Sequence, residues 1–355
     1  MTRRYRVAIV GAGIGAHHVE GFNANPDLFE VAVICDRDGA RAAALAGRVA
    51  AGAAAVHGDY DDALLARDDI DIIDICLPPF LHGAAVTRAL RAGRHVICEK
   101  PLVGSPAEVD ALDEEVRRSG RVLMPVFQAR FGNGLARARH LIASGAAGRV
   151  YLATAQTHWT RGADYYAVDW RGTRAHELGG AFLGHAIHIH DMLTQLIGPV
   201  CRVSAMAATR VNAIQTEDCG GAVLEMADGS IAVLSVTLGS ADEVSRLRIM
   251  CENVTIESHG EVYASAREPW RFVPKAPRDQ AWLDAALAGA PAGKEGFDAQ
   301  FALFHAALES GGVAPVTVGE ARAAIELVSA IYHSARTGER VELPLAGAHP
   351  AYRGW

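Results

Sequence analysis

The first third of the chain alternates between short apolar runs and stretches whose apolar residues recur at helical spacing. The runs are rich in β-branched residues and have the length of buried strands. Strands are predicted at 6–10, 30–35, 71–77, 95–98 and 122–127, and helices at 17–23, 41–49, 82–93 and 106–119. Strands that alternate with helices are typical of an α/β domain with a doubly wound parallel sheet.

The pattern changes after residue 127, where strand-like segments dominate. Strands are predicted at 150–159, 201–210, 221–226, 230–238, 245–251 and 254–258, and helices at 137–144, 181–193, 280–288, 297–310 and 319–337. Asp228-Gly229 is a strong hairpin signal. Consecutive strands without helices between them predict an open, mostly antiparallel sheet in an α+β domain. We therefore predict two domains, 1–127 and 128–355, with the last helix packing back on the body through Ala324, Leu327, Val328 and Ile331.

Composition and charge argue against several classes of protein. A chain of 355 residues is longer than one hydrophobic core usually serves. The net charge is −7 and the only basic cluster is Arg3, Arg4 and Arg6, which argues against a nucleic-acid partner. Glycines interrupt the apolar run at 7–16, and no run approaches the ~18 residues of a membrane helix, so neither a signal peptide nor a membrane is expected.

The six cysteines show no C-x-x-C spacing. Cys35, Cys76 and Cys98 each fall in a predicted strand. They are expected to be small buried side chains of a cytoplasmic protein rather than a disulfide framework.

A glycine-rich turn lies between the first predicted strand and helix. Gly11-Ala12-Gly13-Ile14-Gly15-Ala16 fits the G-x-G-x-x-G/A pattern of Rossmann dinucleotide sites. Gly11 would make the tight turn, Gly13 would let a pyrophosphate approach the backbone, and Ala16 would let helix and strand pack closely. Asp36 ends the second strand, twenty residues after Ala16, where an acidic residue accepts a hydrogen bond from the ribose 2′-hydroxyl. We predict NAD; Arg37 leaves NADP open, because an arginine can hold a 2′-phosphate.

The run His95-Val96-Ile97-Cys98-Glu99-Lys100-Pro101 ends a predicted strand on a carboxylate, an amine and a proline. Ligands of parallel sheets gather beyond the carboxyl ends of the strands. Pro101 ends the strand because it has no N–H, and the Lys100–Pro101 bond is one of the few that can be cis. A surface Glu–Lys pair is the alternative. His82, just past another strand end, would either contact the cofactor or cap its helix.

Three motifs resemble those of one known family. Gly11-Ala12-Gly13-Ile14, Leu77-Pro78-Pro79-Phe80-Leu81-His82 and Glu99-Lys100-Pro101 are similar to the glucose–fructose oxidoreductase, inositol dehydrogenase and rhizopine catabolism (Gfo/Idh/MocA) family. The resemblance implies NAD(P)-dependent redox chemistry on a sugar, polyol or related carbohydrate. It implies that Gly11, Gly13, Ile14, Gly15, Asp36, Arg37, Leu77, Pro78, His82, Glu99 and Lys100 line the cofactor site. Lys100 would also contact substrate and act as a catalytic residue, and the second domain would form a homo-oligomer, a dimer or a tetramer.

The predicted helix 181–193 carries the second motif of this family, Asp-x-Gly-x-His-x-x-Asp after Gly-Gly-Gly. On it His188 matches the catalytic histidine and Asp191 the final aspartate. Gly184 stands where the catalytic aspartate is expected, so an aspartate-assisted proton relay cannot be carried over. At 3.6 residues per turn 184, 188 and 191 share a face, with His185 beside them as the nearest polar substitute.

Other interpretations of these histidines remain open. His185 and His188 could share a metal, but no H-E-x-x-H pattern accompanies them and no metal is predicted. They could also be helix histidines that are satisfied locally.

An aromatic-rich loop precedes this helix. It contains Trp159-Thr160-Arg161, Asp164-Tyr165-Tyr166 and Trp170-Arg171-Gly172. Aromatic faces and guanidinium forks suit the C–H faces and hydroxyls of a sugar, so Arg161, Tyr165, Trp170, Arg171, His185 and His188 are predicted to contact substrate. Packing of the loop against itself is the alternative.

These features predict a dehydrogenase that transfers hydride from a carbohydrate hydroxyl carbon to the cofactor. Lys100 and His188 would share the hydroxyl proton as an acid/base pair. Two alternatives stay open: redox-assisted glycoside cleavage with tightly bound NAD, and a non-enzymatic NAD(P)-binding protein.

Overall fold

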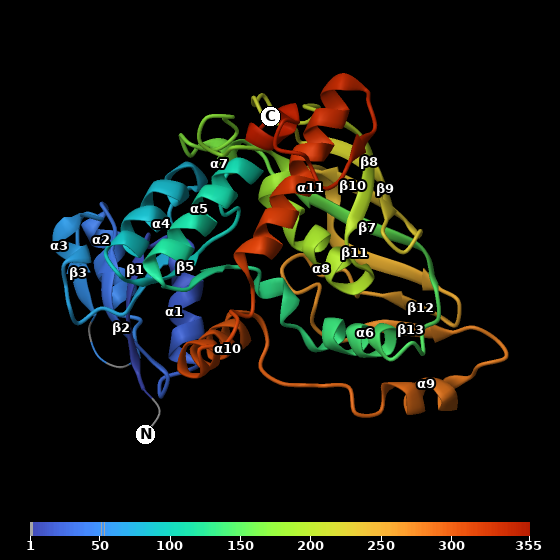
Figure 1. Ribbon diagram of the computed structural model, residues 1–355, viewed down its shortest axis with the longest axis horizontal. Coiled ribbons are helices and arrows are strands. Elements are labelled where there is room, and N and C mark those ends of the chain that lie inside the picture. Colours follow the sequence, from blue (N-terminus) through green and yellow to red (C-terminus); the bar gives the residue numbers. More distant parts are fainter. Residues whose placement is uncertain (1–2, 51, 53) are drawn as a thin grey trace. The chain divides into compact units, whose positions relative to one another are not determined.

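Figure 1 shows the computed structural model, which describes residues 3–50, 52 and 54–355. The chain forms two compact units. The first contains 1–103, 108–128 and 296–322, and the second contains 104–107, 129–295 and 323–355. Apart from the short segment 104–107, the chain crosses into the second unit at 128/129, returns to the first for 296–322 and ends in the second.

The first unit is built on a parallel sheet, as the strand–helix alternation predicts. Its strands are β1 (Tyr5–Val10), β2 (Phe29–Cys35), β3 (Ala55–His57), β4 (Ile72–Ile75), β5 (His95–Cys98) and β6 (Leu123–Pro125). In the part of the chain that the structure describes, they lie in the order β3-β2-β1-β4-β5-β6, with every pair parallel. β3 was not predicted, because its three residues are half-exposed or exposed and show no apolar run.

The order of these strands places the predicted cofactor motifs next to one another. From β1 the chain adds strands on one side (β2, β3) and then, from β4, on the other side (β5, β6). The boundary between β1 and β4 is the topological switch point, where doubly wound folds bind ligands. Gly11, Leu77 and Glu99 follow β1, β4 and β5 at this edge. The Lys100–Pro101 peptide bond is cis.

The helices of this unit match the predictions within a few residues, except for the short α3, which was not predicted. They are α1 (Gly15–Asn23), α2 (Gly39–Ala46), α3 (Asp62–Leu65), α4 (His82–Arg91), α5 (Pro106–Ser119) and α10 (Gly296–Ser310), with a short turn η1 (Pro79–Leu81). Figure 1 shows α10 lying beside α1. Phe22 of α1 stacks on Phe301 of α10 with ring centres 4.3 Å apart, and the Gln300 amide donates to the Pro125 carbonyl of β6 at 2.9 Å. These contacts fix α10 to the sheet.

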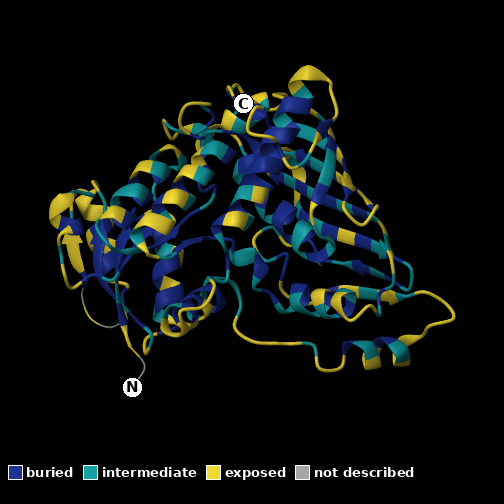
Figure 2. Ribbon diagram, in the orientation of Figure 1, coloured by how far each residue is buried: buried dark blue, intermediate teal, exposed yellow. Residues whose placement is uncertain are grey.

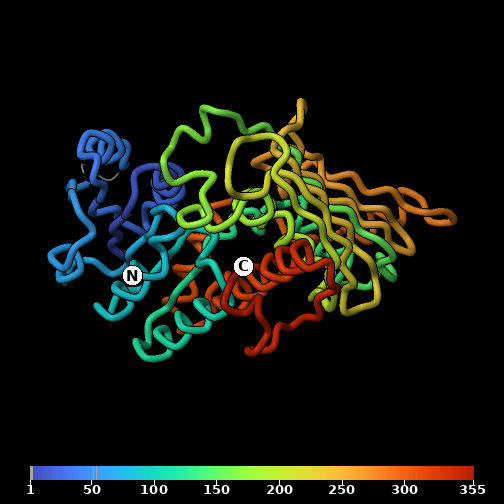
Figure 3. Tube along the Cα trace, turned by 90° about the horizontal axis from the view of Figure 1, so that it is seen from above, coloured from blue at the N-terminus to red at the C-terminus, as the bar shows by residue number. Residues whose placement is uncertain are grey.

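The second unit is built on a mixed sheet whose strands run side by side in Figure 3. Its strands are β7 (Val150–Thr160), β8 (Val200–Ala208), β9 (Cys219–Met226), β10 (Ile231–Thr237), β11 (Gly239–Cys251), β12 (Val254–Glu257), β13 (Arg271–Pro274) and β14 (Val341–Glu342). The order is β13-β12-β11-β7-β10-β9-β8-β14, and among the described strands only β7 and β10 pair in parallel. The mostly antiparallel sheet is thus confirmed. Asp228-Gly229 makes the β9–β10 hairpin, with Gly229 at φ +84°.

The helices of this unit are α6 (Asn133–Ala143), α7 (Ala163–Tyr166), α8 (Ile187–Ile197), α9 (Gln280–Leu287) and most of α11 (Val318–Thr337), with short turns η2 (Gln128–Arg130), η3 (Ala181–His185) and η4 (Pro350–Arg353). α8 packs on β7 and β11. Residues along β7 alternate between buried and partly exposed, as one covered face requires. Figure 2 shows that the helices, too, carry both buried and exposed residues. The predicted apolar positions of α11, Ala324, Leu327, Val328 and Ile331, are buried.

A buried ion pair anchors α8. The Arg130 guanidinium donates to both carboxylate oxygens of Asp191, at 2.6 and 2.7 Å, and both side chains are at least 96% buried. Breaking such a pair costs about 3–5 kcal/mol, because one charge is then left buried without its partner. The family aspartate at 191 therefore holds the helix in place.

Two further predictions concern the cysteines and the absence of a membrane helix. Cys35, Cys76 and Cys98 are buried free thiols, as expected. Among the described residues, no helix has the length and apolarity that crossing a bilayer requires.

Candidate active site

The glycine-rich turn has the geometry that a dinucleotide phosphate needs. Gly11 has φ +106°, and a Cβ there would lie 2.3 Å from the Cys76 carbonyl oxygen, so only glycine fits. At Gly13, no described atom lies within 4 Å of a built Cβ, which leaves the backbone open to a ligand. The N-terminus of α1 follows directly, and helix N-termini favour anions.

One assignment within this motif is corrected. The close approach of helix to strand occurs at Gly15, where a Cβ would come within 3.0 Å of the Ile9 side chain. Ala16 was predicted to have this role but is partly exposed. The helix begins at Gly15, so the small residue that faces the strand comes one position earlier than the motif spacing suggests.

Asp36 is tied to the phosphate loop. One carboxylate oxygen accepts a hydrogen bond from the Ala12 N–H at 2.8 Å, and the other accepts from the Asp38 N–H at 2.9 Å. Arg37 beside it is exposed, as is the apolar side chain of Ile14 on the loop. The described residues therefore fit a dinucleotide, with the carboxylate held at the end of β2 where a ribose hydroxyl is expected.

His82 joins two strand-end loops. It is fully buried at the start of α4. Its Nδ1 lies 2.8 Å from the Pro101 carbonyl and its Nε2 lies 2.7 Å from the Leu77 carbonyl. The side chain thus holds the loop after β4, with Leu77 and Pro78, to the turn after β5. A direct contact of this ring with the cofactor stays a prediction.

Glu99 is buried at the end of β5 and is held through its backbone and its side chain. Its N–H donates to the Ile75 carbonyl at 2.9 Å, which extends the β4–β5 ladder by one residue. One carboxylate oxygen accepts from the Lys100 N–H at 3.0 Å. The other lies 3.0 Å from Nε2 of His18, which was not predicted as a site residue.

In the second unit, tight contacts precede the histidine motif. A Cβ on Gly180 would lie 1.8 Å from the Glu217 carbonyl oxygen, and one on Gly179 would lie 2.6 Å from the Tyr332 hydroxyl. Leu178 stands where the family pattern has its first glycine and has φ +70°, a conformation that costs a branched residue about 1 kcal/mol or more. Among the described residues, Leu178 is the one non-glycine with positive φ.

The histidine motif does not form one continuous α-helix, which corrects the prediction. η3 (Ala181–His185) is a π-helical turn, closed by a hydrogen bond from the Ala186 N–H to the Ala181 carbonyl at 2.9 Å, and α8 begins at Ile187. A wide turn changes the angular spacing, so the 3.6-residue argument that put 184 on the face of 188 and 191 does not extend across Ala186. At Gly184, no described atom lies within 4 Å of a built Cβ.

Glu217 holds the start of this turn. Its buried carboxylate accepts hydrogen bonds from the Gly180 N–H at 3.0 Å, the Phe182 N–H at 2.9 Å and the Tyr332 hydroxyl at 2.8 Å. Burial raises the pKa of Glu217 to about 7, against 4.5 ordinarily, although the three donors oppose the shift.

The aromatic loop forms one cluster of stacked rings and guanidinium groups. The Arg171 guanidinium lies 3.9 Å from the centre of the Tyr165 ring and 4.3 Å from that of Trp170. The Arg161 guanidinium lies 5.2 Å from the Tyr165 ring, and the His185 ring centre lies 5.6 Å from it. The structure thus brings together five residues that were predicted to contact substrate.

Three members of this cluster were not predicted as site residues. The Trp159 ring lies edge-on to His185, with centres 5.1 Å apart, and 4.8 Å from the Arg161 guanidinium. The Tyr263 hydroxyl accepts from Arg161 at 2.6 Å, and Glu243 pairs with Arg161 at 3.0 Å. Trp159 could have been predicted from the sequence, because it ends the predicted strand 150–159 and lies two positions before Arg161. Tyr263 and Glu243 lie about 100 and 80 residues away in sequence and had none.

The cluster is balanced in charge. Arg161 pairs with Glu243, and Arg171 lies 3.6 Å from the buried carboxylate of Glu177. Both arginines also stack on aromatic rings, which fixes their planes. Such groups present oriented N–H donors and flat apolar faces with little net positive charge.

The histidines of the motif differ in environment. His188 is partly exposed on α8. His190 is fully buried, and burial lowers its pKa to about 3, so it is neutral at ordinary pH. In the described part of the chain, the residue types that could hold a metal gather elsewhere, at His18, Asp74 and Cys76 in the first unit.

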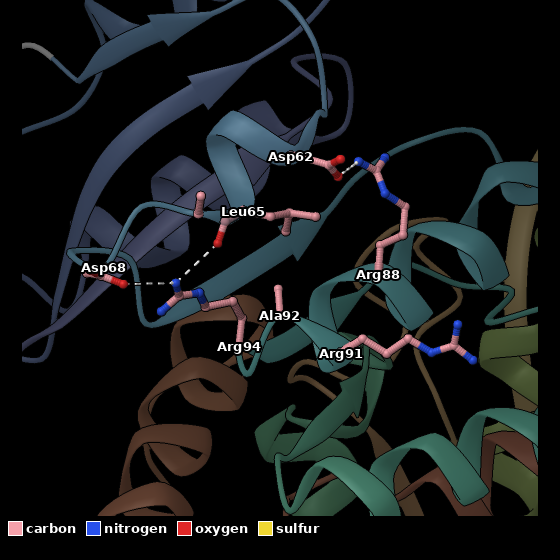
Figure 4. A pocket seen from close by; sticks show the side chains of 8 residues that line it. Asp62, Leu65, Asp68, Arg88, Arg91, Ala92 and Arg94 are labelled. Atoms are coloured by element: carbon pink, nitrogen blue, oxygen red, sulfur yellow. Dashed lines mark hydrogen bonds and ion pairs between the residues drawn. The ribbon is translucent and has the colours of Figure 1, made fainter.

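A shallow hollow in the first unit is drawn in Figure 4. Its charged lining residues are Asp62, Asp68, Arg88, Arg91 and Arg94. Arg88 pairs with Asp62 at 2.9 Å, Arg94 with Asp68 at 3.8 Å, and Arg91 with Glu115 outside the hollow at 2.6 Å. Because each guanidinium group already has a carboxylate partner, the hollow has little capacity for an anion.

The fold and the strand-end residues together define an NAD(P)-dependent oxidoreductase. Residues 5–127 match the model of an oxidoreductase family with an NAD-binding Rossmann fold, and residues 135–257 match the GFO/IDH/MocA C-terminal domain. The chain belongs to the Gfo/Idh/MocA family of oxidoreductases.

Similar proteins act on several carbohydrates. D-xylose 1-dehydrogenase (NADP+) 2 of Haloferax volcanii is 30% identical over 88% of this chain and 92% of its own. Inositol 2-dehydrogenase of Rhizobium meliloti is 30% identical over 76% of this chain and 77% of its own. D-glucoside 3-dehydrogenase of Escherichia coli is 31% identical, and the match spans 54% of each chain, about half the length of that relative.

A solved structure extends the similarity to the whole chain. The WlbA dehydrogenase from Chromobacterium violaceum, in complex with NADH and UDP-GlcNAcA, has a TM-score of 0.84 and 28% identity, covering 97% of both chains.

Glu217 predicts that stability depends on pH. Between about pH 4.5 and 7 the folded protein retains a proton that the unfolded chain has released, so the free energy of unfolding falls as pH rises through this range. The total change from this residue is about 3 kcal/mol at most. In Glu217→Gln the side chain is neutral at every pH, so this part of the slope is lost. Urea unfolding at several pH values measures it.

The matched control for that measurement is Glu114→Gln, which changes an exposed glutamate on α5. It should keep the wild-type slope. Equal slopes for Glu217→Gln and wild type would contradict the assignment.

Proposed function

We propose that this protein is an NAD-dependent dehydrogenase that oxidises a hydroxyl group of an uncharged sugar, polyol or related carbohydrate. The observation that carries the proposal is the cluster of stacked aromatic rings and charge-balanced arginines around Tyr165. Flat apolar faces suit the C–H faces of a sugar ring, and oriented N–H donors suit its hydroxyls. An anionic substrate would instead favour guanidinium groups without carboxylate partners. The relatives named after xylose, inositol and a glucoside support the same class.

NAD is the proposed cofactor because of Asp36. Its carboxylate is held at the end of β2 by the Ala12 and Asp38 N–H groups and would repel the 2′-phosphate of NADP. Arg37 is the residue through which NADP would still bind, and the Haloferax relative is named for NADP.

The cofactor, when bound, supplies the acceptor for the hydride. The residues of this chain position the carbohydrate and move its hydroxyl proton. We assign that proton to Lys100 and His188, one taking it from the hydroxyl and the other passing it on. Gly184 offers no carboxylate to assist, so His185 on the same segment is the nearest titratable ring.

A panel of sugars and polyols with NAD and NADP, read by the absorbance of the reduced cofactor, tests the function. A parallel panel of aryl glycosides is needed. Reduced cofactor in proportion to oxidised sugar is the expected result. Aryl glycoside cleavage without net reduced cofactor would favour redox-assisted cleavage instead. Cofactor binding without turnover on either panel would favour a non-enzymatic role.

The variant Lys100→Ala should lower kcat by about 100-fold or more, because acid–base assistance in enzymes has about that size. Binding of NAD, measured by calorimetry, should be retained. Lys275→Ala removes an exposed lysine after β13 and should match wild type. Near-normal turnover of Lys100→Ala would remove this lysine from the mechanism.

We also propose that the protein forms a homo-oligomer through the uncovered face of the second unit's sheet. This face exposes apolar side chains that a soluble sheet normally avoids. Val223 and Val233 are cross-strand partners on β9 and β10, and Ile231 and Met206 are also exposed.

Light scattering tests the oligomer. Wild type should have the mass of a dimer or tetramer, and Val233→Glu should reduce it, because a charge would be buried in the interface. Val313→Glu, at an exposed position outside the sheet, is the control and should keep the wild-type mass. A monomeric wild type would contradict the proposal.

A further inference from the structure

A buried chain of polar groups runs beneath the strand-end motif. His18 of α1 lies between two carboxylates: its Nδ1 is 2.8 Å from Asp74 of β4, and its Nε2 is 3.0 Å from Glu99 after β5. His18 and Asp74 are 0% exposed and Glu99 is 5% exposed. Asp74 interrupts the otherwise apolar strand β4. A carboxylate in that position is costly unless it is paired, so it calls for an explanation.

The surroundings exclude water and fix the ring. Phe297 and Phe301 of α10 pack on the His18 imidazole, with ring centres 4.7 and 5.4 Å away. Both ring nitrogens face carboxylate oxygens, and only an imidazolium can donate from both. Burial opposes this charge, yet the nearby Asp74 carboxylate raises the pKa of His18 well above its ordinary value.

Direct hydrogen bonding explains this cluster better than a metal. Cys76 Sγ lies 3.4 Å from His18 Nδ1, so that histidine, cysteine and aspartate atoms are close together. The 2.8 Å between His18 Nδ1 and Asp74 is a hydrogen-bond length, whereas two ligands of one tetrahedral zinc ion, each about 2.0 Å from it, would be about 3.3 Å apart.

We propose that His18 and Asp74 are positioning residues that hold the Glu99 carboxylate, and through it the Lys100 backbone, in the arrangement that cofactor binding and catalysis need. The proposal deepens the proposed function and rests on it for the role of Lys100. Glu99 uses one oxygen on His18 and the other on the Lys100 N–H, so its orientation is fixed from both sides. Asp74 in turn fixes the imidazole and keeps it charged, which lets Nε2 donate to Glu99.

Two substitutions of His18 separate its two contacts. The side-chain amide of Asn places its nitrogen near the position of Nδ1, so His18→Asn keeps the donor to Asp74 and loses the donor to Glu99. Gln reaches the position of Nε2, so His18→Gln keeps the donor to Glu99. Both remove a ring from the same core, so a merely structural role predicts similar effects of the two variants.

The readouts are the Kd for NADH, measured by fluorescence titration, and kcat and KM on a substrate found in the panel. His18→Asn should weaken NADH binding and lower kcat by about tenfold or more each, because the strand-end groups lose their fixed orientation. His18→Gln should recover most of both losses. Equal losses in the two variants would overturn the proposal.

A second variant guards against a simple loss of folding. His305→Asn removes another buried imidazole of the first unit, one that contacts the Arg3 carbonyl at 2.7 Å and packs on Phe29, away from Glu99. It should lower the thermal midpoint as His18→Asn does, while the NADH Kd of the folded protein stays at the wild-type value. An equal loss of NADH binding in His305→Asn would show that the effect is only structural and would overturn the proposal.

A double-mutant cycle tests whether His18 acts through Glu99. His18→Asn should add little to the loss caused by Glu99→Gln, because the second change removes the group that His18 positions. Losses that multiply would overturn the proposal, as would one equivalent of zinc or another transition metal in the purified protein. Absence of turnover on every carbohydrate would refute the proposed function, whereas the NADH titrations would still decide the role of His18.

Discussion

The structure depends most on the in-register parallel pairing of β1, β4 and β5. Val10 of β1 pairs with Ile75 of β4, which pairs with Cys98 of β5, so the three strands end at one level. The ladder continues past the strands, because Cys76 N–H donates to the Val10 carbonyl and Glu99 N–H to that of Ile75. The glycine turn and Lys100 belong to segments far apart in sequence, yet backbone hydrogen bonds hold both at the same level of the sheet. A slip of one residue would turn every side chain at this edge to the opposite face.

In the second unit, the Glu217 side chain helps to fix the backbone next to the histidine segment. Glu217 holds the start of the histidine segment: its carboxylate accepts from the Gly180 and Phe182 N–H groups, and its backbone carbonyl accepts from the Ala181 N–H. The Tyr332 hydroxyl closes the network from α11. The first unit uses Asp74 and Glu99 in a comparable way around His18. Both units thus use buried carboxylates to fix neighbouring groups, and each such carboxylate is costly for stability unless it is paired.

Much of this arrangement could be predicted from the sequence, because local patterns carry it. Alternation of strands and helices, glycine spacing and the acidic residue after β2 identified the parallel sheet and its cofactor edge.

The predictions that failed have physical causes. The motif spacing assigned the tight packing of helix and strand to Ala16. This was wrong, because helix α1 begins at Gly15 and Gly15 is the residue that faces the strand. The π-helical turn before Ala186 arises from tertiary contacts that no periodicity shows. His18 was overlooked because its partners come from two later strands, although a lone aspartate inside the apolar strand β4 was a visible sign. Tyr263 joins the aromatic cluster from a loop that carries no signal.

Gly184 has an implication for selectivity. Relatives with the family pattern carry a carboxylate where this chain has a hydrogen atom, and the structure leaves that volume unfilled by described neighbours. An aspartate there would fix one hydroxyl of a substrate and turn away bulk or negative charge. If the carbohydrate of the proposed function binds beside Gly184, the missing carboxylate would trade a polar anchor for room. Discrimination between carbohydrates would then depend less on hydrogen-bond matching at this point and more on the outline of the ring and its branches.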